Sequence, residues 1–177
     1  PAQDWDKREA KLDRKATLKL LAFARTATNN EVLNRAKEAY ELIITYYDDQ
    51  NDKAHRAMGH EKKDGVWKSP EIEEDWPDLA NDEQRFKVIG AWKEIAEQVG
   101  GLHRELGMEM LEKEPERSRR HLELAIYYNP FDGEAHEAIG HKAFEEFWGT
   151  DEEIAFVERM REIEKFCVDL LYDFAQR

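Results

Sequence analysis

Two segments of the chain are similar in sequence, and this internal repeat constrains the fold more than any other feature. Segments 46–71 and 127–152 align without a gap at an offset of 81 residues, with nine of 26 positions identical. The identical pairs are Tyr46/Tyr127, Tyr47/Tyr128, Ala54/Ala135, His55/His136, Ala57/Ala138, Gly59/Gly140, His60/His141, Trp67/Trp148 and Glu71/Glu152. Unrelated segments of average composition would share about one or two identities. The repeat therefore predicts a chain built from two copies of one structural unit.

Each copy is predicted to be helical. Apolar residues recur at intervals of three and four residues before each copy, and the polar stretches 48–51 and 129–130 end these helices. Asp132 is the expected N-cap of a second helix that runs on through Ala143. Gly59 and Gly140 are expected inside the second helices. A glycine in a helix costs about 1 kcal/mol relative to alanine, so its repetition indicates a need for close helix packing.

Further helices are predicted on both sides of the repeated segments. The apolar patterns indicate helices over about 5–28, 81–99, 102–113 and 154–174. Gly100 and Gly101 either separate the middle two helices or kink one longer helix. Ser69-Pro70 and Thr150 each resemble a helix start. No alternation typical of a strand is present.

These patterns predict an all-α fold of antiparallel helix hairpins, arranged as a short solenoid of two related units. Residues 1–177 are expected to form a single helical repeat domain. Unit one covers about 1–77 and unit two about 78–177, with a linker at Asp75-Trp76-Pro77-Asp78.

Composition limits the classes of partner. Asp and Glu number 40 against 27 Lys and Arg, which gives a net charge of -13 and argues against nucleic-acid binding. A hydrophobic content of 41% with 11% aromatic residues indicates a folded chain although 38% of residues are charged. No apolar run approaches the roughly 18 residues that a membrane-spanning helix needs.

The sequence does not determine the cellular compartment of the protein. The sequence begins at Pro1 rather than Met, so we expect a trimmed or processed chain or a part of a longer protein, either cytoplasmic or exported after signal removal. The single cysteine, Cys167, permits no internal disulfide and lies among apolar residues. We expect a buried structural thiol, with a reactive thiol as the alternative.

The repeated histidines are the candidates for chemistry. Segment 136–141 is one residue longer than the zinc-protease motif, whose histidines are four residues apart. A spacing of five places His136 and His141 about 140° apart around a helix, as it does His55 and His60. No metal ligands, catalytic residues or cofactor are therefore predicted, and the histidines are expected to cap or pack between helices.

Other catalytic patterns are missing from the sequence. No glutamate precedes a histidine by three residues, as di-iron bundles require. No phosphate-binding glycine loop or nucleophile elbow is present. Trp67 and Trp148 are predicted to be structural residues of the core. Replacing either with alanine is then expected to cost about 3 to 5 kcal/mol.

The helix pairs resemble tetratricopeptide (TPR) repeats. Met58-Gly59 and Ile139-Gly140 stand where that family prefers Leu-Gly, and Pro130 matches its closing proline. The sequence motif Ala-His-x-Ala-x-Gly-His is similar to motifs of divergent bacterial TPR-like proteins. Lys62 and Ala143 replace the usual tyrosine, and the long spacing requires an insertion around 64–80. The resemblance implies a helical scaffold for protein partners without catalysis.

Three functions are consistent with these observations. The first is a non-catalytic scaffold for protein–protein interaction or subunit assembly, with a partner-binding groove that carries His60 and His141, and His55 and His136 nearby. The second is a metal-binding protein or enzyme whose site is built from the repeated histidines. The third is a structural subunit of a larger assembly that docks through its C-terminal helix.

Overall fold

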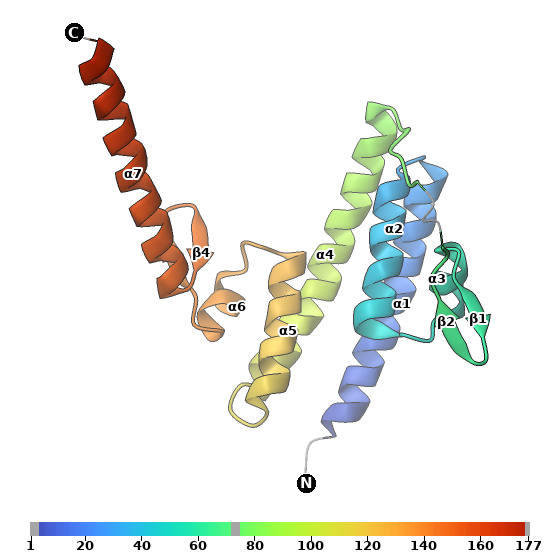
Figure 1. Cartoon of the computed structure of the whole chain (residues 1–177). Coiled ribbons are helices and arrows are strands. Elements are labelled where there is room, and N and C mark those ends of the chain that lie inside the picture. Colours follow the sequence, from blue (N-terminus) through green and yellow to red (C-terminus); the bar gives the residue numbers. More distant parts are fainter. Residues whose placement is uncertain (1–3, 72–74, 176–177) are drawn as a thin grey trace. The chain divides into compact units, whose positions relative to one another are not determined.

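The computed structural model describes residues 4–71 and 75–175, and most of these residues are helical (Figure 1). In chain order the elements are α1 (Trp5–Asn29), α2 (Leu33–Leu42), the π-helical turn η1 (Ile43–Tyr47), α3 (Asp52–Ala57), β1 (Glu61–Lys63), β2 (Val66–Lys68), α4 (Asp82–Met110), α5 (Pro115–Tyr128), α6 (Gly133–Ala138), β3 (Lys142–Phe144), β4 (Phe147–Gly149) and α7 (Asp151–Ala175). The prediction of a mainly helical chain is confirmed. Pro1 and Arg177, the predicted ends of the domain, lie outside the described residues.

Two short antiparallel hairpins add to the helices. In the first, Lys62 of β1 lies opposite Trp67 of β2, and in the second, Ala143 of β3 lies opposite Trp148 of β4. The expectation that no strands form is wrong here, because three-residue strands are too short to give a recognisable alternation. The predicted helix through Ala143 is also wrong. α6 ends at Ala138, and Ala143 lies in the strand β3.

One order of elements occurs twice along the chain: two longer helices, a short helix and a hairpin. The short helix and hairpin of the second set have bounds 81 residues after those of the first. The longer helices correspond in burial. Every buried position of α1 has a buried counterpart 83 residues later in α4: Trp5/Val88, Leu12/Ile95, Ala16/Val99, Thr17/Gly100, Leu20/His103, Phe23/Leu106, Ala24/Gly107 and Ala27/Met110.

The π-helical turn η1 explains why the offset falls from 82 to 81 at the end of the first helix pair. Four buried positions at the end of the first pair have buried counterparts at an offset of 82: Ala36/Ser118, Ala39/His121, Leu42/Leu124 and Ile43/Ala125. Tyr46 and Tyr127 correspond at an offset of 81 and are similarly exposed, at 41% and 44%. A π turn accommodates one inserted residue within an α-helix. η1 therefore absorbs an extra residue and keeps the same face of the helix buried.

Helices pack closely within each pair. α2 packs along α1. In the second pair, the Ser118 hydroxyl of α5 donates to the Gly107 carbonyl of α4 at 2.7 Å. A Cβ atom at Gly107 would lie 2.8 Å from Cγ of Leu122, so glycine allows this approach. By packing, the chain divides into two compact units, Pro1–Leu102 and His103–Arg177, with the boundary inside α4.

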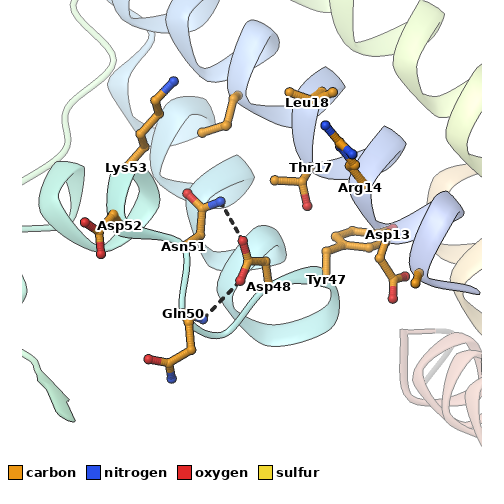
Figure 2. Close-up of a pocket in the computed structure, with 12 residues that line it drawn as sticks. Asp13, Arg14, Thr17, Leu18, Tyr47, Asp48, Gln50, Asn51, Asp52 and Lys53 are labelled. Carbon is orange, nitrogen blue, oxygen red and sulfur yellow. Dashed lines mark hydrogen bonds between the residues drawn. The ribbon is translucent and has the colours of Figure 1, made fainter. Parts of the chain in front are cut away.

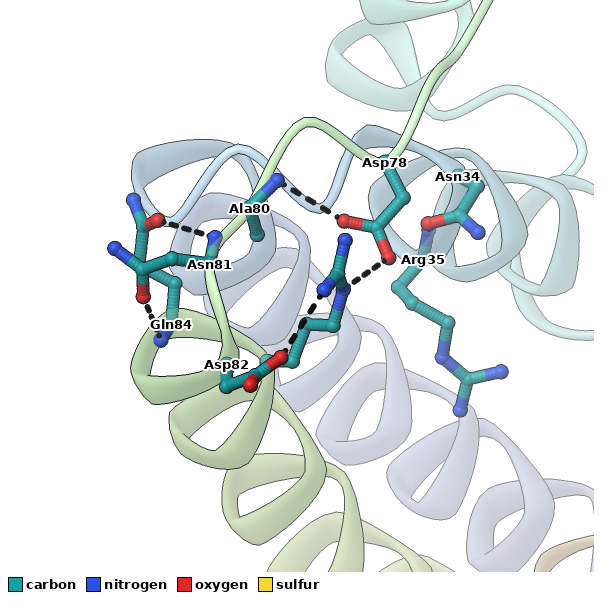
Figure 3. A network of polar contacts seen from close by, with 8 residues as sticks. Asn34, Arg35, Asp78, Ala80, Asn81, Asp82 and Gln84 are labelled. Carbon is teal, nitrogen blue, oxygen red and sulfur yellow. Dashed lines mark hydrogen bonds and ion pairs between the residues drawn. The ribbon is translucent and has the colours of Figure 1, made fainter.

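Polar contacts tie the segment that precedes α4 to the first turn of that helix (Figure 3). Asp78 forms an isolated β-bridge with Val32, and its carboxylate accepts from Arg85 Nε at 2.8 Å. This hydrogen bond lowers the pKa of Asp78. Asn81 and Gln84 exchange hydrogen bonds between side chain and backbone, at 2.9 and 3.0 Å, which forms a capping box.

The predicted helix boundaries had mixed outcomes. Asp132 caps α6 through Ala135 N, and Thr150 and Glu153 form a capping box at the start of α7, as predicted. Gly100 and Gly101 lie within one continuous helix, α4. The predicted helix start at Ser69-Pro70 is wrong, because these residues are not helical and α4 begins at Asp82.

Candidate functional site

Two clusters of histidine and tryptophan occupy corresponding places in the chain. The first cluster consists of His55, His60 and Trp67, and the second cluster of His136, His141 and Trp148. In each cluster, the first histidine lies in the short helix, the second lies just before the hairpin, and the tryptophan lies in the second strand. The sequence predicted all six residues as binding or structural positions.

Glycine brings the two histidines of each cluster together. Gly59 and Gly140 follow the short helices with positive φ angles of 73° and 87°. They turn the chain so that the backbone N–H of His60 donates to the carbonyl of His55 at 2.9 Å, and that of His141 to His136 at 2.9 Å. The expectation that these glycines lie inside helices is wrong. They are needed for a left-handed backbone conformation at the helix end, which glycine adopts without steric cost.

The histidine rings meet through their Nδ1 atoms. The distance is 2.7 Å between His55 and His60 and 2.8 Å between His136 and His141. The angular argument from a spacing of five fails because the helix ends between the two residues. A contact of this length between neutral imidazoles requires one protonated and one unprotonated Nδ1.

The first histidine of each pair is fixed at both ring nitrogens. Nε2 of His55 lies 2.8 Å from the carbonyl oxygen of Asp49, and Nε2 of His136 lies 3.0 Å from that of Pro130. A carbonyl only accepts, so each Nε2 carries the proton and donates. In the neutral clusters the Nδ1 of His55 and His136 therefore accept from Nδ1–H of the second histidine. Both first histidines are 5% exposed.

Each tryptophan stacks flat on the buried histidine of its cluster. The ring centroids of Trp67 and His55 are 4.5 Å apart, those of Trp148 and His136 are 5.3 Å apart, and both interplanar angles are 8°. Lys62 from β1 lies over the Trp67 ring, 5.0 Å from its centroid. The prediction of buried core tryptophans is wrong in degree, because both side chains are half-buried. Their place in two-stranded hairpins leaves both tryptophans partly exposed.

His60 faces a small pocket. This pocket of about 230 Å³ is also lined by Met58, Pro70 and Trp76. Burial, followed by the nearby His55, lowers the pKa of His60. His60 is thus half-buried in the wall of a pocket that also carries the charged side chains of Lys37 and Glu41.

A third histidine pair lies in the second helix pair. Nδ1 of His103 in α4 is 2.8 Å from Nδ1 of His121 in α5, and both residues are buried. Burial, followed by the nearby His121 and Arg120, lowers the pKa of His103 to about 3. The sequence analysis missed this pair, because residues 18 positions apart on two helices form no local motif. All six histidines are thus used in pairs.

The histidine pairs are held together by hydrogen bonds between their rings. In each cluster, both ring nitrogens of the first histidine are already engaged in hydrogen bonds. Across residues 4–71 and 75–175, no three or more His, Cys, Asp or Glu side chains gather as metal ligands would. The clusters as described therefore tie a hairpin to a helix end.

A wider pocket lies where α1 meets η1 and the start of α3 (Figure 2). It measures about 570 Å³ and has charged groups of both signs, among them Asp13, Arg14 and Lys53. Asp48 lies in its wall and accepts from Gln50 N and from Asn51 Nδ2, at 3.2 and 2.9 Å. This carboxylate is therefore committed to the turn that starts α3.

A continuous apolar surface lies on α7. We define the α7 strip as seven large, exposed apolar side chains on one face of this helix: Phe156, Met160, Ile163, Phe166, Leu170, Leu171 and Phe174. Val168 and Tyr172 are also exposed but lie towards the opposite face. Cys167 lies within the strip and is exposed, so the prediction of a buried thiol is wrong. Among the described residues, no helix combines the length and apolar character needed to cross a membrane.

The polar residues of α7 lie against the neighbouring hairpin. Arg161 forms a two-bond ion pair with Glu145 in the β3–β4 turn and lies over the Phe144 ring, 5.6 Å from its centroid. Lys142 pairs with Asp151 at the start of the helix. The hairpin therefore fixes the side of α7 that carries Arg161 and leaves the strip exposed.

Comparisons with models of protein families, with curated proteins and with solved structures found no match to this chain.

Proposed function

We propose that this chain is a non-catalytic, TPR-like helical repeat protein that acts as a scaffold for protein–protein interaction or subunit assembly. The observation that carries the proposal is the α7 strip, which leaves a large apolar area exposed on a charged chain. Exposed apolar areas of this size are typical of interaction sites. The recurring order of elements and the matching buried positions support the repeat architecture.

The histidine clusters fit this proposal as structural supports. His55 and His136 each anchor a hairpin through two hydrogen bonds and a stacked tryptophan. Such supports hold the loops between helices in a defined shape. His60 and His141 are half-buried and retain an outer edge that a partner can reach.

Affinity capture with a matched pair of variants tests the proposal. The full chain is immobilised and exposed to its native lysate, and the bound proteins and metals are identified in the same eluate. We expect a stoichiometric protein partner that is lost with Leu170→Glu and retained with Tyr172→Glu. Tyr172 is also exposed on α7 but lies off the strip, so it controls for the added charge.

Stoichiometric zinc, copper or iron in that eluate, without a protein partner, would overturn the proposal. It would favour the alternative of a metal site built from the repeated histidines. His55→Ala and His136→Ala would then be expected to remove the metal.

A further inference from the structure

We infer that the α7 strip is the dimerisation surface of this protein, where α7 of a second copy of the chain packs parallel to the first. The inference names the partner for the proposed function and rests on that function.

The α7 strip repeats the buried face of the preceding long helices. Five positions buried in α4 have counterparts on this face of α7, 68 residues later: Val88/Phe156, Ile95/Ile163, Val99/Cys167, His103/Leu171 and Leu106/Phe174. In α1 and α4 this face is buried; α2 packs against α1, and α5 packs against the C-terminal part of α4 at Gly107. In α7 the same face is exposed, between 49% at Ile163 and 77% at Phe174. α7 thus has the surface of a helix that requires a second helix.

The spacing along the strip matches packing between two similar helices. Phe156, Met160, Ile163, Cys167, Leu170 and Phe174 follow each other at alternating intervals of four and three residues. This pattern gives the a and d positions of nearly three heptads, which keep one seam facing a partner helix along the whole length. A helix with such a seam is complementary to itself, and two-fold pairing of identical surfaces is the commonest form of oligomer.

The exposed area is sufficient for a stable dimer. Phe156, Phe166 and Phe174 are 63%, 65% and 77% exposed. With about 150–250 Å² for each aromatic side chain, they alone present roughly 300–500 Å². The exposed parts of the four aliphatic members of the strip bring the total close to the roughly 800 Å² per partner of a standard interface.

Charges beside the seam favour the parallel orientation. With Met160 at position a, Arg159 occupies position g and Glu164 occupies the e position of the next heptad. In a parallel pair, g of one helix lies beside the following e of the other, so each Arg159 meets Glu164 of the second copy. The next pair of g and e positions would join Phe166 to Leu171 of the second copy, and this contact is apolar. An antiparallel pair would bring Glu164 against Glu164 of the second copy.

Sedimentation equilibrium of the full chain, with a thiol reductant present, tests the inference. We expect the mass to rise from 20.9 kDa towards twice that value across the micromolar range. Ile163→Glu or Leu170→Glu is expected to raise the dissociation constant by about 30-fold or more, as for a central interface residue. Both side chains are about half exposed in the single chain, so these variants are expected to fold, which circular dichroism checks.

Tyr172→Glu is the matched control, since it adds the same charge to an exposed residue of α7 away from the seam. It is expected to leave the dissociation constant unchanged within about two-fold. Dimerisation that persists in Leu170→Glu, or that is lost equally in Tyr172→Glu, would overturn the strip as the interface. A mass that stays at one chain at all concentrations would overturn dimerisation itself.

A charge exchange tests the orientation. Arg159→Glu places like charges together and is expected to weaken the dimer about three- to ten-fold. Adding Glu164→Arg restores the pair in a parallel dimer and is expected to recover the original dissociation constant. Failure of this rescue would overturn the parallel arrangement.

The result separates the inference from the proposed function. A monomeric chain that still captures another protein through Leu170 would disprove the dimer and leave the scaffold function standing. A dimer that captures no other protein would support the inference and limit the proposed function to self-assembly.

Discussion

The two helix pairs of this chain bury corresponding positions with different chemistry. In α1–α2, Leu20 and Ala39 are fully buried, and their counterparts in α4–α5 are His103 and His121. These histidines are also buried and share a contact of 2.8 Å between Nδ1 atoms. One backbone arrangement thus accepts either an apolar pair or a hydrogen-bonded pair. Both members must change together, because a single buried imidazole leaves a polar group without its partner.

The largest expected effect comes from breaking the histidine pair on one side only. His121→Ala leaves His103 buried without its Nδ1 partner and opens a small cavity. We expect a loss of about 2–4 kcal/mol in the free energy of unfolding, measured by urea denaturation at pH 7.5.

The double variant His103→Leu/His121→Ala sharpens the comparison, because it installs the residues of the first helix pair. It is expected to recover most of the stability lost in His121→Ala. A double variant as unstable as the single one would show that the two helix pairs are not interchangeable at these positions.

Low pH is expected to lower the free energy of unfolding through protonation of His103 in the unfolded chain. Its pKa is lowered from the ordinary value of 6.5 to about 3, mainly by burial, so the folded chain holds this imidazole neutral. The unfolded chain binds a proton at His103 below about pH 6.5, which favours unfolding. The contribution of His103 is therefore complete above pH 6.5 and declines by about 1.4 kcal/mol per pH unit as the pH falls towards 3.

Urea denaturation at several pH values tests this expectation. The double variant His103→Leu/His121→Ala serves as the control and should have a shallower loss of stability between pH 6.5 and pH 4. Identical slopes in the two proteins would contradict the proposed role of His103.

The two histidine–tryptophan clusters are expected to respond alike. Trp67 and Trp148 are half-buried and stack on His55 and His136 at the same angle. Half burial reduces the expected cost of alanine at either position to about 1–3 kcal/mol, below the value for a fully buried aromatic residue. Thermal unfolding of the two single variants measures this cost. Costs that differ by more than about 2 kcal/mol would show that the clusters are not equivalent.

The smallest expected effect separates two kinds of glycine. Gly140 has a φ of 87°, and alanine there is expected to cost about 1 kcal/mol through strain in the left-handed region. Gly101 lies within α4, and a methyl group added there would stand in open space, so Gly101→Ala is expected to stabilise the chain by up to about 1 kcal/mol. Opposite shifts in thermal midpoint are expected, and equal shifts would contradict the distinction.

α7 differs from α1 and α4 in what surrounds the same pattern. Leu20 and His103 are buried, whereas the corresponding Leu171 is 70% exposed. The same apolar pattern therefore occurs whether or not a second helix covers it, and the pattern does not predict burial. This is why Cys167 was expected to be buried and is exposed.

Several local features followed from the sequence because they depend on neighbouring residues. Asp132 and Thr150 cap their helices as predicted, since a capping side chain reaches a backbone N–H only three residues away. The hairpins themselves were missed, because three paired residues per strand leave no periodic signal.

By itself, the sequence determined the helical character of the chain, the capped starts of α6 and α7 and the correspondence between its two repeated segments. These features depend on local propensity, capping and a recurring pattern of identities. Only the tertiary structure decided that a spacing of five brings His55 to His60, that His103 meets His121, and that the face of α7 stays exposed. These contacts depend on where a helix stops and on which helix lies opposite, and neither property is encoded within a few residues of the side chains involved.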